Sequence, residues 1–198
     1  KKGKMFPLPD KNPVGIDIGA HSAKLVKFKG SEGAFSLEEA VCLNLPKGGA
    51  DLAGEIAGLI AGAVKSRRLS GRYAATVVPQ GQMISRHIYL PVMPDKDLKE
   101  AVRWELRKDL PFPADELLAD YVRAGSGVKT AENNISIIAF AARRSEVERL
   151  ICALKDAGLD LRLVEAAPTA MLSSFDLAYE WDEGANSAML DIGVNQST

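Results

Sequence analysis

The feature that most constrains the fold is a strand-and-turn pattern that occurs near both ends of the 198-residue chain. The first copy, PVGIDIGAHSAK, occupies residues 13–24, and the second, SAMLDIGVNQST, occupies residues 187–198. In each copy a short apolar run leads into Asp, an apolar residue and Gly, which predicts a strand that enters a tight turn. One Asp-x-Gly is usually an ordinary turn. Two copies in the same context favour a shared role.

The two turns carry residue types that suit phosphate and Mg²⁺. Glycine allows a positive φ and a close approach of the backbone to a ligand, and successive N–H groups in a turn form an anion-binding concavity. Asp17 and Asp191 would face Mg²⁺, which keeps several waters and bridges phosphate oxygens. We therefore expect the turns to hold a nucleoside triphosphate. A P-loop or Rossmann site is disfavoured, since the sequence has neither G-x-x-x-x-G-K-S/T nor G-x-G-x-x-G after a strand.

Charge and composition exclude several classes of protein. Lys and Arg number 25 against 26 for Asp and Glu, so the balance predicts no general attraction for nucleic acid or an anionic membrane. The sequence has no apolar run of about 18 residues, and its opening lacks the apolar segment of a signal peptide, so we expect a cytoplasmic protein. Cys42 and Cys152 are isolated, and we expect both to be reduced and buried.

Residues 13–82 are expected to form a mixed sheet covered by a helix. Residues 23–29 alternate, so that Lys27 and Lys29 should face solvent, and residues 35–45 give a third strand of an antiparallel meander. Apolar residues at helical spacing predict a helix over 51–65, and YAATVV at 73–78 is typical of a buried strand.

A second series of elements follows residue 82, in the order β-α-β-β-α-β of a small α+β module. Its strands are expected at 83–90, 118–124, 135–142 and 161–164, and its first helix at 95–110. Ser145 and Glu148 form a capping box for its second helix, which Gly158 would end. After residue 168 the sequence returns to the larger domain, with a helix predicted to about residue 181. The module is therefore expected to be an insertion in the larger domain.

Three segments make the sequence resemble the PilM family of type IV pilus assembly proteins, relatives of the division protein FtsA. They are GIDIGAHSAKLVKF, then RHIYLPVMPDKDLKEAVRWELRKDLPFPADELLADYVR, then VEAAPTAMLSSF before MLDIG. The resemblance implies an α/β fold with an actin-like ATPase (ribonuclease H-like) subdomain that carries an inserted α+β subdomain. It assigns 1–12 to a flexible lead-in, 13–82 and 167–198 to subdomain 1A, and 83–166 to subdomain 1C. The second lobe, 2A and 2B, would be largely absent.

The resemblance also implies ATP and Mg²⁺ as ligands. Asp17 and Gly19 match the first phosphate turn, with Ser22 and Lys24 at its far end. The second turn is matched by Asp191 and Gly193, with Ser197 or Thr198 in the hydroxyl position. The sequence Val194-Asn195-Gln196 departs from the usual Gly-containing pattern, which would weaken the approach of phosphate. No catalytic residue is assigned, because two isolated histidines give no nucleophile–base pair. Hydrolysis is therefore expected to be weak or absent.

The implied partner is the short cytoplasmic N-terminal tail of the membrane protein PilN, held in a groove between subdomains 1A and 1C. Arg86, Tyr89 and Phe112 are assigned to that groove, and Trp104 either shapes it with Pro111-Phe112-Pro113 or packs beneath that turn. Contacts with other proteins of the pilus inner-membrane complex are expected, and self-association stays open. The protein would reach the inner membrane only through partners, and would serve pilus biogenesis and twitching motility.

Three other functions remain open from the sequence. An FtsA-like division filament protein would need an amphipathic C-terminal membrane helix, which these residues do not contain. The cytoplasmic lobe of a type II secretion L-type protein would continue into a transmembrane helix. A small-molecule kinase of the same superfamily would need a positioned base beside its acceptor.

Overall fold

The chain forms two compact units, which we describe separately. The computed structural model describes residues 13–31, 34–46, 52–69, 72–108, 110–124, 134–179 and 187–192. Unit 1 comprises Lys1–Pro79 and Arg149–Thr198, and unit 2 comprises Gln80–Glu148. The lead-in expected at 1–12 lies outside the described residues.

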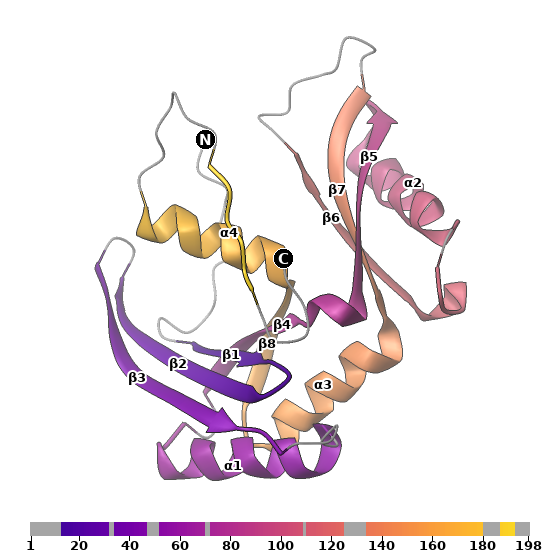
Figure 1. The fold of residues 1–198 in the computed structure, drawn as a ribbon. Helices are drawn as coiled ribbons and strands as arrows, with labels where there is room; N and C mark the ends of the chain where they lie inside the picture. Colours follow the sequence, from indigo (N-terminus) through magenta and orange to yellow (C-terminus); the bar gives the residue numbers. More distant parts are fainter. Residues whose placement is uncertain are drawn as a thin grey trace. The chain divides into compact units, whose positions relative to one another are not determined.

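Unit 1 is built on a five-stranded mixed sheet in the order β3-β2-β1-β4-β8 (Figure 1). Its strands are β1 (Val14–Ile18), β2 (Ser22–Ser31), β3 (Ala34–Asn44), β4 (Tyr73–Val78) and β8 (Asp160–Ala166). The strands β1, β2 and β3 are antiparallel neighbours, whereas β4 is parallel to both β1 and β8. The predicted meander and mixed sheet are confirmed.

The core of unit 1 lies on one face of this sheet. A π-helical turn (Leu52–Ile56) leads into α1 (Ala57–Ser66), and α3 (Arg144–Asp156) follows much later in the chain. Alternate residues of β1 and β2 bury Val14, Ile16 and Leu25 against Ile60 of α1 and Leu154 of α3. By contrast, α4 (Ala167–Ala178) has no buried side chain and contacts β4 and β8. The sheet therefore has one well-covered face and one more open face.

Two predictions about single side chains in unit 1 are wrong. Lys27 is only 9% exposed, because it belongs to the same alternating set as the core residues Ala23 and Leu25. Its ammonium group pairs with Glu38 at 2.9 Å, next to a bulge that shifts the register after Lys27. Cys42 and Cys152 are both exposed free thiols, since neither lies on an apolar face of its strand or helix.

Unit 2 is a three-stranded antiparallel sheet in the order β5-β7-β6, with α2 on one face. Its elements are β5 (Met83–Pro91), α2 (Asp95–Arg107), β6 (Leu117–Arg123) and β7 (Asn134–Arg143), with 3₁₀ turns at Gln80–Gln82 and Ala114–Glu116. The i, i+4, i+8 stripe Leu98, Val102 and Leu106 is fully buried on the sheet, as the helical periodicity predicts. In the part of the chain that the structure describes, no helix is both long and apolar enough to cross a bilayer.

The predicted insert extends too far at its C-terminal end. The strand β8 pairs in parallel with β4, and α3 buries Leu150 and Leu154 in the core of unit 1. The boundary between the units therefore falls within α3 rather than at 166. The Ser145 cap is also wrong, because α3 already begins at Arg144 and the Ser145 hydroxyl donates to Glu116 at 2.7 Å.

Two helices end in the same Schellman arrangement, with different residues at the left-handed position. After α3, Gly158 (φ 89°) donates to the Lys155 carbonyl at 2.9 Å, and Leu159 donates to that of Leu154 at 3.2 Å. After α1 the corresponding residue is Arg68, with φ 55°. A side chain at this position costs about 1 kcal/mol, and glycine avoids that cost.

We therefore expect Gly158→Ala to lower the free energy of unfolding by about 1 kcal/mol. Arg68→Gly should raise it by about 0.5 kcal/mol, since the greater freedom of glycine in the unfolded chain offsets part of the gain. Denaturant unfolding of both variants measures these changes. If neither variant shifted the unfolding midpoint, the proposed cost at the left-handed position would be refuted.

The ion pair of Lys27 with Glu38 makes stability depend on pH. The hydrogen bond from Lys27 holds the pKa of Glu38 below its ordinary value of 4.5. This carboxylate therefore stabilises the fold above about pH 4.5, and the contribution is lost as the pH falls through the lowered pKa. We expect Glu38→Gln to lower the free energy of unfolding at neutral pH, because it leaves the Lys27 charge without its partner. The difference from the native chain should shrink in acid, where Glu38 itself is protonated.

Unfolding curves from neutral to acidic pH measure this effect, with Glu148→Gln, an exposed position on α3, as the control. A Glu38→Gln penalty that did not change with pH would argue against it.

Candidate functional site

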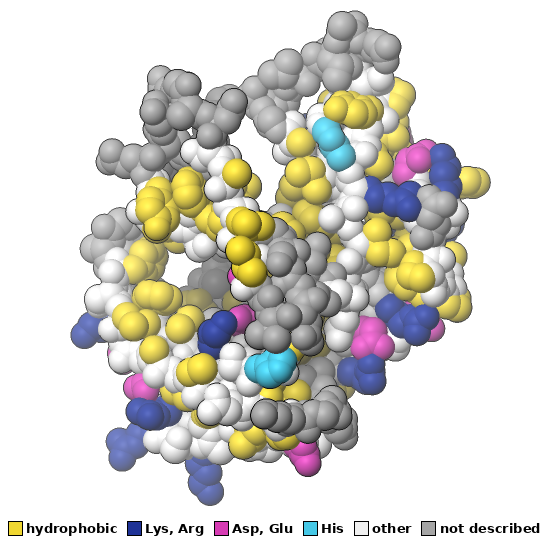
Figure 2. Space-filling model, in the orientation of Figure 1, with side chains coloured by type: hydrophobic (Ala, Val, Ile, Leu, Met, Phe, Trp, Pro, Cys, Tyr) yellow, Lys and Arg dark blue, Asp and Glu magenta, His cyan; other side chains and the backbone are white. Residues whose placement is uncertain are grey.

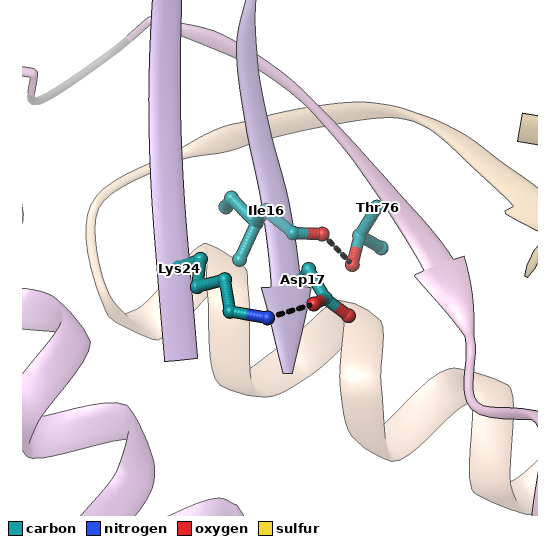
Figure 3. Close-up of polar contacts among 4 residues, drawn as sticks. All are labelled: Ile16, Asp17, Lys24 and Thr76. Carbon is teal, nitrogen blue, oxygen red and sulfur yellow. Dashed lines mark hydrogen bonds and ion pairs between the residues drawn. The ribbon is translucent and has the colours of Figure 1, made fainter. Parts of the chain in front are cut away.

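The first predicted turn places two opposite charges side by side at the end of β1. Asp17 lies directly opposite Lys24 in the antiparallel pairing of β1 with β2, so both side chains are on the same face. The Lys24 Nζ lies 3.3 Å from the Asp17 Oδ2 (Figure 3), and both side chains are more than half exposed. This is the face opposite the core residues Val14 and Ile16. A ligand could therefore reach both charges.

The backbone beside this pair is fixed by a buried hydrogen bond. Thr76 on β4 is only 3% exposed, and its hydroxyl donates to the Ile16 carbonyl at 2.9 Å (Figure 3). Ile16 immediately precedes Asp17 and pairs with Thr76 in the parallel ladder. Sequence reasoning missed Thr76, although a hydroxyl in the apolar run YAATVV was the available signal.

The turn itself is closed by backbone hydrogen bonds. The Gly19 N–H donates to the Ser22 carbonyl at 2.9 Å, and the Leu45 N–H donates to the His21 carbonyl at 2.8 Å. Gly19 does not have a positive φ. A Cβ at Gly19 would meet the Ser22 carbonyl at an ordinary 3.4 Å. Glycine is therefore not required by the turn itself.

The second predicted turn is only partly described. Residues 187–192 are exposed and join neither sheet as a strand; Ile192 makes an isolated bridge. The predicted strand before this turn is thus not formed, and its apolar residues Leu190 and Ile192 remain exposed. Asp191 is exposed, whereas Gly193, Ser197 and Thr198 lie outside the described residues.

The described residues do not provide a ready-made metal site. Among them, no group of three or more His, Cys, Asp or Glu side chains is placed to hold a metal ion. Asp17 and Asp191 are each a single carboxylate on the surface. This arrangement suits Mg²⁺ only in the mode in which waters and phosphate oxygens complete the coordination.

The three predicted groove residues do not share one surface of unit 2. Tyr89 is 56% exposed on the sheet face that α2 leaves uncovered, where its ring lies 4.7 Å from that of His87. Phe112 packs on the α2 side beneath the Arg143 guanidinium, 5.4 Å from its ring centroid. The half-buried Arg86 alternates with Tyr89 along β5 and so belongs to the α2 side. Trp104 is 66% exposed and does not pack beneath the Pro-Phe-Pro turn.

The sequence pattern of the family described as "Type IV pilus assembly protein PilM" matches residues 15–198, nearly the whole chain. The chain belongs to this family. The predicted family resemblance is confirmed, and with it the α/β fold class of a mixed sheet with helices.

Solved structures support the same placement. A "PilM-PilN type IV pilus biogenesis complex" matches with a TM-score of 0.69 and 30% identity, over 81% of this chain and 49% of that one. The chain thus spans about half the length of this PilM-family relative. A second match is the cytoplasmic domain of EpsL, an inner-membrane component of the type II secretion system of Vibrio cholerae. It has a TM-score of 0.57 and 9% identity, over 78% of this chain and 57% of the EpsL domain. The latter identity shows similarity of fold alone.

Thr76 gives a test of how the turn is held. Thr76→Val keeps the size of the side chain but leaves the buried Ile16 carbonyl without the hydroxyl, which should cost about 1–2 kcal/mol of unfolding free energy. Thr76→Ser keeps the donor and is the control for the hydrogen bond. Denaturant unfolding measures both, and a Val variant as stable as the native chain would show that the bond contributes nothing.

Proposed function

We propose that this chain is part of an actin-like, ATP-binding scaffold in the inner-membrane complex that assembles type IV pili, and that it binds the cytoplasmic tail of PilN. The observation that carries this proposal is the family match over residues 15–198, together with 30% identity to the protein of the PilM-PilN complex. The type II secretion protein is much more distant at 9% identity. A pilus function is therefore favoured over a secretion function.

Nucleotide binding is supported by the geometry of the first turn. Asp17 offers a carboxylate to a water-coordinated Mg²⁺, and Lys24 offers a point charge to a phosphate. Their mutual ion pair is exposed and contributes little to stability, so a ligand could replace it at small cost. Ser22, Gly19 and the second turn around Asp191 would complete the site. The chemistry that bound Mg²⁺ supplies is neutralisation of phosphate charge.

The proposed role of ATP is conformational, with weak or absent hydrolysis. This expectation rests on the sequence, in which the two isolated histidines give no nucleophile–base pair. Nucleotide would act by favouring one arrangement of the scaffold over another and so changing its affinity for the tail. The protein would work in the cytoplasm and reach the membrane through PilN.

Lys24→Met tests the nucleotide proposal. Removing the charge that faces phosphate should weaken MgATP binding about tenfold or more, because a hydrogen bond to a charged group contributes about 1.5–3 kcal/mol. Stability should change by less than about 1 kcal/mol, because the lost ion pair is exposed. Calorimetric titration with MgATP measures the affinity, and Lys29→Met is a matched control at the far end of β2. Equal affinities for the native chain and Lys24→Met would count against a phosphate role.

The partner proposal is tested by titrating the chain with a synthetic peptide of the PilN cytoplasmic tail, with a scrambled peptide as control. We expect specific binding that Tyr89→Ala weakens about tenfold or more, because exposed aromatic residues often anchor partners. Trp104→Ala removes a similarly exposed ring from α2 and should leave the affinity unchanged. Repeating the titration with MgATP shows whether nucleotide changes the affinity. Equal binding of the tail and scrambled peptides would reject this partner.

A further inference from the structure

Positive charge is concentrated at the end of unit 1 opposite the Asp17 turn. Because β1 and β4 are parallel, the end of the sheet where β4 begins is opposite the end where β1 reaches Asp17. At that end lie the exposed residues Lys29 near the end of β2, Lys65 in the last turn of α1, Arg68 just after it, and Arg72 just before β4. We call these four residues the basic corner.

Several contacts tie these elements together. The Arg72 N–H donates to the Leu69 carbonyl at 3.1 Å, which connects the turn after α1 to the start of β4. Arg67 pairs with Glu39 of β3 at 2.9 Å, which connects the same turn to the β2–β3 pair. After the dominant hydrogen bond from Lys27, the nearby charges of Lys29 and Arg72 also lower the pKa of Glu38. The basic corner is therefore one surface.

The charges of the basic corner are not neutralised locally. Neighbouring Arg67 and Arg162 are paired, with Glu39 and Asp160. Within the described ranges, none of the four corner residues forms an ion pair. The whole chain carries a net charge of −1, so a local surplus of four positive charges is a strong asymmetry. Figure 2 shows several Lys and Arg side chains at the lower left, over the β2–β3 and α1 side of the molecule.

An exposed apolar ribbon adjoins the basic corner. Lys27 is the last residue of β2 that pairs with β1, so among the described residues the outer part of the β2–β3 hairpin pairs with no third strand. One face of this projecting ribbon carries Phe28, Phe35 and Leu37, which are 44%, 44% and 56% exposed. Phe28 and Leu37 are cross-strand partners, and Lys29, the next residue of β2, projects from the opposite face of the ribbon. Lys29 and the apolar residues thus share the projecting part of the hairpin but not one face.

The basic corner and the exposed apolar residues of the projecting ribbon together indicate the kind of partner. A single phosphate group is usually held in a concavity, but the corner residues are spread over three elements. Two hollows among the described residues lie elsewhere, one between α2 and β6 (about 290 Å³) and one beside α4 (about 70 Å³). Cations attracted to anionic headgroups, beside Phe and Leu that enter the interface, are typical of surfaces that lie on a membrane. An acidic protein would use the cations but would not require the apolar ribbon.

We propose that the basic corner and the projecting ribbon contact an anionic lipid surface directly. Lys29, Lys65, Arg68 and Arg72 bind headgroup phosphates, and Phe28, Phe35 and Leu37 enter the interfacial region. This contact adds a direct membrane interaction to the one made through PilN. It also leaves the Asp17–Lys24 turn free, because that turn is at the other end of the sheet.

The test is co-sedimentation of the chain with vesicles, without PilN or nucleotide. We expect binding to vesicles that contain phosphatidylglycerol, little binding to pure phosphatidylcholine, and loss of binding in high salt, where the screening length falls from about 10 Å to about 3 Å. Replacing all four corner residues by Gln should reduce binding at least tenfold. Phe28→Ser with Leu37→Ser should also reduce it, with the salt dependence retained.

The matched control replaces four cations of unit 2 by Gln, namely Lys96, Lys99, Arg103 and Arg107 on α2. These alternate with acidic residues, and their loss should change vesicle binding less than twofold. Circular dichroism checks that each variant is folded. The proposal is overturned if the chain does not bind anionic vesicles at low salt, if it binds neutral vesicles equally, or if the α2 variant loses as much binding as the corner variant. Binding of an acidic protein without binding of vesicles would also overturn it.

Discussion

The pairing of β1 with its two neighbours is the constraint on which unit 1 depends. Val14 and Ile16 are buried in the core, whereas Asp17 lies on the opposite face. Side chains alternate along a strand, so a slip of one residue would expose Ile16 and bury Asp17. The register that buries the core therefore also places Lys24 beside Asp17. Packing and site geometry are consequences of the same hydrogen-bonded ladder.

The site combines a fixed backbone with exchangeable charges. Thr76 holds the Ile16 carbonyl from within the sheet, and breaking such a buried bond is costly. The ion pair between Asp17 and Lys24, by contrast, is exposed and weakly stabilising. In the proposed nucleotide complex, Mg²⁺ would take the place of Lys24 beside Asp17, and phosphate would take the place of Asp17 beside Lys24. Neither exchange would disturb the strand. That division between rigid support and loosely held charges is what a reversible ligand site requires.

Local patterns in the sequence predicted the elements well but not their partners. The buried stripe of Leu98, Val102 and Leu106 follows directly from helical periodicity, and the meander follows from alternation. No local pattern states which sheet a strand joins, so β8 was assigned to the insert although it pairs with β4. The solvent-facing assignment of Lys27 failed for a similar reason. A lysine with a buried stem and a paired ammonium group can occupy the core face of a strand.

Net charge is a poor guide to this molecule because the fold separates its charges. A total of −1 argues against attraction to an anionic surface only if positive and negative residues are evenly mixed. The structure instead brings together cations that are up to 43 positions apart, from Lys29 to Arg72, at one end of the sheet of unit 1. Short-range attraction depends on this local surplus, because salt screens the more distant acidic residues. The interaction proposed for this surface thus follows from the way the fold groups the cations, which the net charge of the whole chain does not reveal.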